Sequence, residues 1–114
     1  MRLFAGQRAW VLQRASALVL LVLLALAAAV LLVGPPVSYA RWHALATSSH
    51  GAVLIVVFFG AMCLHGWIGA RDIVLDYVHA PALRLALLTL LAVLLSAILV
   101  RVVLTIAAQL PGAA

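Results

Sequence analysis

The chain has 114 residues, of which 69% are hydrophobic and 8% charged, whereas charged residues make up about a quarter of an average soluble domain. All the charges are arginines and aspartates, with a formal net charge of +5. The arginines stand singly along the chain, whereas a phosphate-binding surface needs clustered cations. The composition therefore excludes a soluble globular domain and argues against a nucleic-acid partner.

Three long apolar stretches can be distinguished, at residues 15–33, 51–70 and 85–108, and the third includes one charge, Arg101. A hydrocarbon core about 30 Å thick needs roughly 20 apolar residues in a helix, so each stretch can cross a bilayer. With helical continuation into the flanking residues, we predict helices at about 15–33, 51–76 and 83–108. The predicted fold is all-α, an integral membrane bundle of three transmembrane helices. It forms a single anchor domain over residues 1–114, without room for an extramembrane catalytic domain.

The boundaries of these helices are marked by residues that stop or start them. Gly34-Pro35-Pro36 ends the first, because proline lacks a backbone donor and clashes with the preceding turn. Thr47-Ser48-Ser49 offers N-caps for the second helix. Ala80-Pro81 separates the second from the third, and Pro111-Gly112 closes the chain. The first apolar run is longer than the h-region of a signal peptide, so we expect it to be retained.

The distribution of arginines predicts the orientation. Five lie before the first span or between the second and third, against Arg41 alone in the other connection (Arg2, Arg8, Arg14, Arg71 and Arg84). By the positive-inside rule the N-terminus is cytoplasmic. Arg101 falls inside the third span, where it either snorkels to the outer interface or pairs with another chain.

His65 is the one ionisable side chain between residues 51 and 70 apart from the thiol of Cys63. An imidazole in the membrane needs a partner or a metal. Its helical neighbours include Ala61, Gly66 and Gly69, so the backbone beside the ring is bare enough for a flat, bulky group such as a haem. The same small residues also suit a helix-packing seam with no redox role, and spacing alone leaves both readings open.

A polar stripe continues from His65 if the helix extends past Ala70, because Asp72 and Asp76 share that face. Tyr77 lies twelve residues after His65, about 18 Å further along the axis. A phenol can donate a hydrogen bond to a quinone carbonyl, and a nearby carboxylate can relay protons. Arg14 stands at a suitable depth for a haem propionate, or serves as an ordinary cytoplasmic anchor.

Two motifs at a fixed distance carry a family resemblance. The run Leu64-His65-Gly66-Trp67-Ile68-Gly69 is followed by Asp76-Tyr77 and then by Leu83-Arg84-Leu85, and Gln13-Arg14-Ala15-Ser16-Ala17 precedes them at the first span. This pattern resembles the small hydrophobic anchor subunit of bacterial succinate dehydrogenase. The resemblance covers about Gln13 to Arg101.

The resemblance implies a non-catalytic membrane subunit of succinate:quinone oxidoreductase, respiratory complex II, in the bacterial inner membrane. His65 would ligate the iron of a b-type haem shared with the companion cytochrome b anchor subunit. Tyr77 would hydrogen-bond ubiquinone, with Asp76 beside it. Electrons from succinate, in the tricarboxylic acid cycle, would arrive through flavoprotein and iron–sulfur subunits. FAD and iron–sulfur clusters are therefore expected only in those partners.

Three departures from the family pattern affect the expected quinone pocket: Arg71-Asp72, Pro35-Pro36 and Arg101. If Arg71 pairs with Asp72 or Asp76, that carboxylate is a structural counter-ion rather than a proton relay. Two alternative functions stay open, a purely structural membrane protein and the anchor of a fumarate reductase. We expect the other histidines to be interfacial, capping or loop residues without a metal (His43, His50 and His79).

Overall fold

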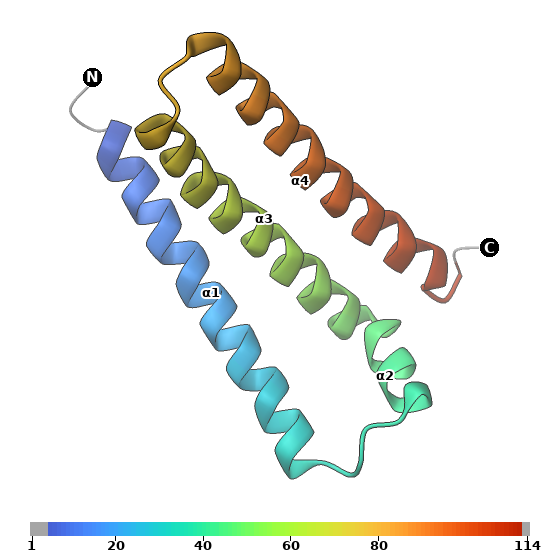
Figure 1. Ribbon diagram of the computed structural model, residues 1–114. Helices are drawn as coiled ribbons and strands as arrows, with labels where there is room; N and C mark the ends of the chain where they lie inside the picture. Colours follow the sequence, from blue (N-terminus) through green and yellow to red (C-terminus); the bar gives the residue numbers. More distant parts are fainter. Residues whose placement is uncertain (1–4, 113–114) are drawn as a thin grey trace.

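The computed structural model describes residues 5–112, and that part of the chain contains four helices and no strand. The long helices are α1 (Ala5–Val33), α3 (Ser49–Tyr77) and α4 (Pro81–Gln109), and α2 (Tyr39–Ala46) is a short helix between α1 and α3. The long helices run antiparallel to their chain neighbours, with α3 between α1 and α4 (Figure 1). The all-α prediction with three membrane-length helices is confirmed.

Each long helix has 29 residues, or roughly 43 Å at 1.5 Å per residue, which exceeds the hydrocarbon thickness of about 30 Å. The predicted helices were therefore shorter than the observed ones, mainly at the start of α1. α1 begins at Ala5 rather than near residue 15, and α4 begins at Pro81, in the first-turn position that suits proline. The physical reason is that an apolar run measures the depth of hydrocarbon, whereas the helix continues through the polar interface.

The predicted stop and start signals act as expected. α1 ends at Val33, directly before Gly34-Pro35-Pro36. Ser48 is the N-cap of α3, with its hydroxyl oxygen accepting a hydrogen bond from the Gly51 amide at 3.1 Å. Ser38 caps α2 in the same way through the Arg41 amide, at 3.2 Å. That helix was expected to be a loop, because eight residues next to two prolines give too short a periodic pattern to recognise.

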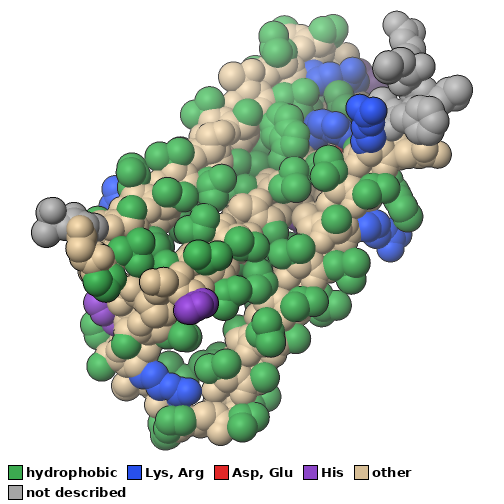
Figure 2. Space-filling model, turned by 180° about the vertical axis from the view of Figure 1, so that it is seen from behind, with side chains coloured by type: hydrophobic (Ala, Val, Ile, Leu, Met, Phe, Trp, Pro, Cys, Tyr) green, Lys and Arg blue, Asp and Glu red, His purple; other side chains and the backbone are tan. Residues whose placement is uncertain are grey.

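The bundle has almost no enclosed core. Within the described chain five residues are buried, and none of them lies on α4 (Ser16, Ala46, Gly51, Ala52 and Ile68). Hydrophobic side chains are displayed along all three long helices instead (Figure 2). Exposing this much apolar surface to water would be strongly unfavourable, so lipid or partner subunits must cover it.

The junction of α2 and α3 is packed most tightly at Gly51. A Cβ added there would collide with the backbone carbonyl of Leu45 and lie 2.9 Å from Ser48 Oγ. We expect Gly51→Ala to destabilise the fold by about 1–3 kcal/mol, since a backbone carbonyl cannot give way cheaply. Thermal unfolding of the detergent-solubilised chain measures this.

The matched control is Gly60→Ala, in the middle of α3, where an added Cβ meets nothing within 4 Å. We expect this variant to unfold at or slightly above the wild-type temperature, because alanine has the higher helix propensity. Equal midpoints for the two variants would contradict the packing of the α2–α3 junction.

Candidate functional site

A polar cluster joins α1 and α3 near the middle of the bundle. His65, close to the midpoint of α3, is half-buried and has both ring nitrogens in contact with α1. Its Nδ1 lies 3.2 Å from Ser16 Oγ, and its Nε2 lies 3.4 Å from the Gln13 Nε2. Ser16 is only 4% exposed. The imidazole is thus held between two helices at a depth that the hydrocarbon core occupies.

The sequence places these groups together by helical spacing and small residues. Gln13 and Ser16 are three apart, so they share one face of α1. On α3, a Cβ at Gly69 would come to an ordinary contact distance of 3.5 Å from Gln13 Nε2. Around Gly66 an added Cβ would meet nothing within 4 Å. The backbone flanking His65 is therefore bare, as expected, and Gly69 borders the Gln13 amide.

The cluster leaves one polar atom without a partner in the described chain. Gln13 Oε1 is buried and accepts no hydrogen bond, a condition that typically costs about 1–3 kcal/mol. No role was predicted for Gln13 or Ser16 from the sequence, although both stand in the motif at the first span. The available signal was an amide and a hydroxyl one turn apart where an apolar run begins.

Asp76 and Tyr77 lie at the C-terminal end of α3, away from His65. Both are exposed, and Tyr77 retains 79% of its accessible surface. The rise of an α-helix places Tyr77 about 18 Å from His65 along the axis. The structure therefore separates the expected site residues into a histidine cluster at mid-membrane depth and a phenol with a carboxylate at the end of the bundle.

Two arginines organise this end of the bundle. Arg71 pairs with Asp72 at 2.8 Å, and not with Asp76, so the choice left open by the sequence falls on Asp72. Such an exposed pair contributes about 0–1 kcal/mol. Arg84, on α4, donates to the carbonyl oxygens of Leu75 and Val78, both at 3.0 Å. A cation suits the C-terminal end of a helix, and this one secures the turn next to Tyr77.

Arg14 does not point to the histidine cluster in this structure. Its guanidinium lies over the Trp10 ring, 5.2 Å from the ring centroid, and the side chain is exposed. Trp10 lies one helical turn before Arg14, so the two exposed side chains share a face of α1 and can make this cation–π contact. A role toward a haem propionate would require the side chain to leave that contact.

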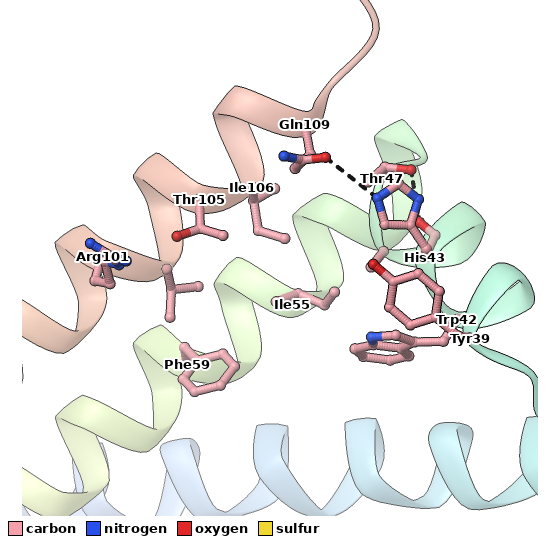
Figure 3. A pocket seen from close by; sticks show the side chains of 12 residues that line it. Tyr39, Trp42, His43, Thr47, Ile55, Phe59, Arg101, Thr105, Ile106 and Gln109 are labelled. Carbon is pink, nitrogen blue, oxygen red and sulfur yellow. Dashed lines mark hydrogen bonds between the residues drawn. The ribbon is translucent and has the colours of Figure 1, made fainter.

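A hollow lies at the end of the bundle opposite Tyr77, between α2, α3 and α4 (Figure 3). It measures about 310 Å³, and its lining includes Trp42, His43, Phe59 and Arg101. His43 Nε2 lies 3.4 Å from the Gln109 side-chain oxygen, which ties α2 to α4. Arg101 is exposed and has no carboxylate partner within residues 5–112. This end therefore carries aromatic and cationic groups but neither of the aspartates.

The fold and the cluster define a small multi-pass helical membrane protein with a histidine held at mid-membrane depth. Residues 1–107 match the family described as succinate dehydrogenase/fumarate reductase transmembrane subunit. The chain is also similar to the succinate dehydrogenase hydrophobic membrane anchor subunit of Coxiella burnetii (strain RSA 493 / Nine Mile phase I). The two are 37% identical over 90 residues, which cover 79% of this chain and 78% of the relative.

The chain therefore belongs to the succinate dehydrogenase/fumarate reductase transmembrane subunit family, and the resemblance in its sequence is confirmed. It is a membrane anchor subunit, and a subunit of this kind has partner subunits in its complex.

Proposed function

We propose that this subunit contributes one axial ligand, His65, to a b-type haem shared with the companion cytochrome b anchor subunit. The subunit would also form part of the site where electrons from succinate reduce ubiquinone. The observation that carries the proposal is the position of His65, half-buried at mid-span between α1 and α3. Imidazole is a common axial ligand of haem iron.

The residues around His65 fit a haem. Gly66 has open space beside it, and the buried Gln13 Oε1 next to the ring has no partner in the described chain. This chain would supply one ligand of the haem iron, and the companion anchor subunit would supply the other. The haem, when bound, supplies a one-electron carrier, and the role of this chain is to hold and orient His65 toward it.

The quinone site is proposed at the end of α3, where Tyr77 and Asp76 are exposed. The Tyr77 hydroxyl would donate a hydrogen bond to a quinone carbonyl, which orients the ring and stabilises the charge that develops on reduction. Asp76 would pass protons toward the reduced carbonyl. The pairing of Arg71 with Asp72 supports this role, because it leaves Asp76 outside that ion pair.

The proposed setting is the bacterial inner membrane, with the N-terminus and the α3–α4 connection on the cytoplasmic side. The excess of arginines at that end supports this orientation. The proposed partners are the companion anchor, an iron–sulfur subunit and a flavoprotein subunit. FAD and the iron–sulfur clusters would reside in the last two, because this chain has one cysteine and no dinucleotide-binding fingerprint.

Operation as a fumarate reductase anchor is the second candidate, because the matching family includes both enzymes. The same helices and the same histidine would serve either direction. Rates of succinate oxidation and fumarate reduction with quinones of different potential, measured on one preparation, would distinguish the two.

The proposal is tested by a dithionite-reduced minus oxidised absorbance spectrum of the complex, purified in mild detergent through a tag on this chain. We expect the bands of a low-spin b-type haem. A preparation that contains the partner subunits but shows no such bands would overturn the haem assignment and leave a haem-free anchor.

A further inference from the structure

The donor and acceptor roles of the His65 ring nitrogens depend on the tautomer, and the contacts of Ser16 favour one of the two. The hydroxyl has one hydrogen, and it donates to the carbonyl oxygen of Gln13 on the preceding turn at 3.0 Å. If the hydroxyl hydrogen stays on that carbonyl, Oγ is the acceptor at its 3.2 Å contact with His65 Nδ1, and Nδ1 carries the proton.

The remaining contact agrees with the same tautomer. A neutral imidazole protonated at Nδ1 has a lone pair on Nε2. The Gln13 side-chain Nε2, 3.4 Å away, has hydrogens to donate to that lone pair. One tautomer thus accounts for all three contacts, and it is the form in which histidine binds a metal through Nε2 while its other nitrogen donates to an oxygen.

The Gln13 amide is poorly anchored where it lies. Its nitrogen faces Nε2 of His65 at the outer limit of a hydrogen bond, while its oxygen is buried without a partner. Any iron that binds Nε2 must take the direction that this amide now occupies. The amide can leave at little cost, because it makes one long hydrogen bond there and its oxygen has no partner to lose.

We infer that Ser16 is a positioning residue, which fixes the tautomer and ring orientation of His65 for iron ligation. We further infer that the Gln13 amide is an exchangeable occupant of the ligand position, displaced when the haem binds. Both statements rest on the proposed function of His65. They describe how two side chains of α1, Ser16 and Gln13, position His65 of α3 before the haem binds.

The tautomer is tested on the haem-free full chain in detergent, labelled with ¹⁵N-histidine. The ¹⁵N shifts of the two ring nitrogens distinguish Nδ1–H from Nε2–H, and the His65→Ala spectrum identifies the signals. We expect Nδ1–H in the wild type and a shift of population toward Nε2–H in Ser16→Ala. Protonation of the wild-type ring at Nε2 would overturn the inference, whatever the outcome with haem.

The effect on the haem is tested on the purified complex by its haem content and by the rate of haem transfer to excess apomyoglobin. Loss of a group that orients a metal-binding histidine typically weakens metal binding 10- to 100-fold. We expect a loss of that order in Ser16→Ala and near wild-type retention in Ser16→Thr, which keeps the hydroxyl. Ser96→Ala, an exposed serine on α4, is the matched control and should leave retention unchanged.

Gln13→Ala tests the second half of the inference. Removing the side chain should leave haem retention equal or stronger, because nothing then has to be displaced from Nε2. Weaker retention would overturn the role of Gln13 as an exchangeable occupant. If the wild-type complex holds haem and Ser16→Ala holds it equally well, the positioning role fails alone. If the wild type holds none, the proposed function fails, and the ¹⁵N measurement still reports the tautomer.

Discussion

Replacement of His65 by alanine is expected to abolish the b-type haem bands of the purified complex. The substitution removes the imidazole that lies between α1 and α3 at mid-span, which is the proposed ligand of the haem iron. Loss of a residue that only orients a ligand costs about 10- to 100-fold in metal affinity, so loss of the ligand itself should exceed this. The reduced minus oxidised spectrum, normalised to partner-subunit content, measures the effect.

His50→Ala is the matched control, because His50 is an exposed histidine in the first turn of α3, far from His65. Its spectrum should equal that of the wild type. A His65→Ala complex with unchanged composition and an unchanged spectrum would favour the structural alternative, in which His65 belongs to a packing seam between the helices.

Replacement of Tyr77 by phenylalanine is expected to slow quinone reduction by roughly 10- to 100-fold. Removing one preorganised donor from a site of developing charge costs about 10²–10³-fold in an enclosed site, and the exposure of Tyr77 argues for a smaller effect than that. The haem spectrum should be intact, because Tyr77 lies about 18 Å from His65 along the helix. Succinate-driven reduction of a ubiquinone analogue measures the rate.

Two controls separate a quinone defect from a general one. Reduction of a soluble dye by succinate, which bypasses the quinone site, should be unchanged in Tyr77→Phe. Tyr39→Phe alters the other tyrosine, on α2 at the far end of the bundle, and should reduce quinone at the wild-type rate. A wild-type rate in Tyr77→Phe would remove this residue from the quinone site.

The features that the sequence predicted are those governed by local chemistry. A run of apolar residues long enough for the bilayer predicted each long helix, and proline and serine predicted where α1 ends and α3 begins. His65 stood out because an imidazole among apolar residues needs a partner. The start of α1 was missed by ten residues, because helical geometry continues where hydrophobicity stops. α2 was missed because eight residues carry too little periodicity.

The partners of each polar group depended on tertiary structure. Ser16 and Gln13 lie 49 and 52 residues from His65, and only the packing of α1 against α3 brings them to its two ring nitrogens. Packing of α4 against α3 likewise brings Arg84 to the carbonyls at the end of α3. Apolar residues occur all around these helices, so no single face is marked for burial by the sequence. The sequence determined that the helices can cross a membrane, whereas side-chain packing decided which faces meet.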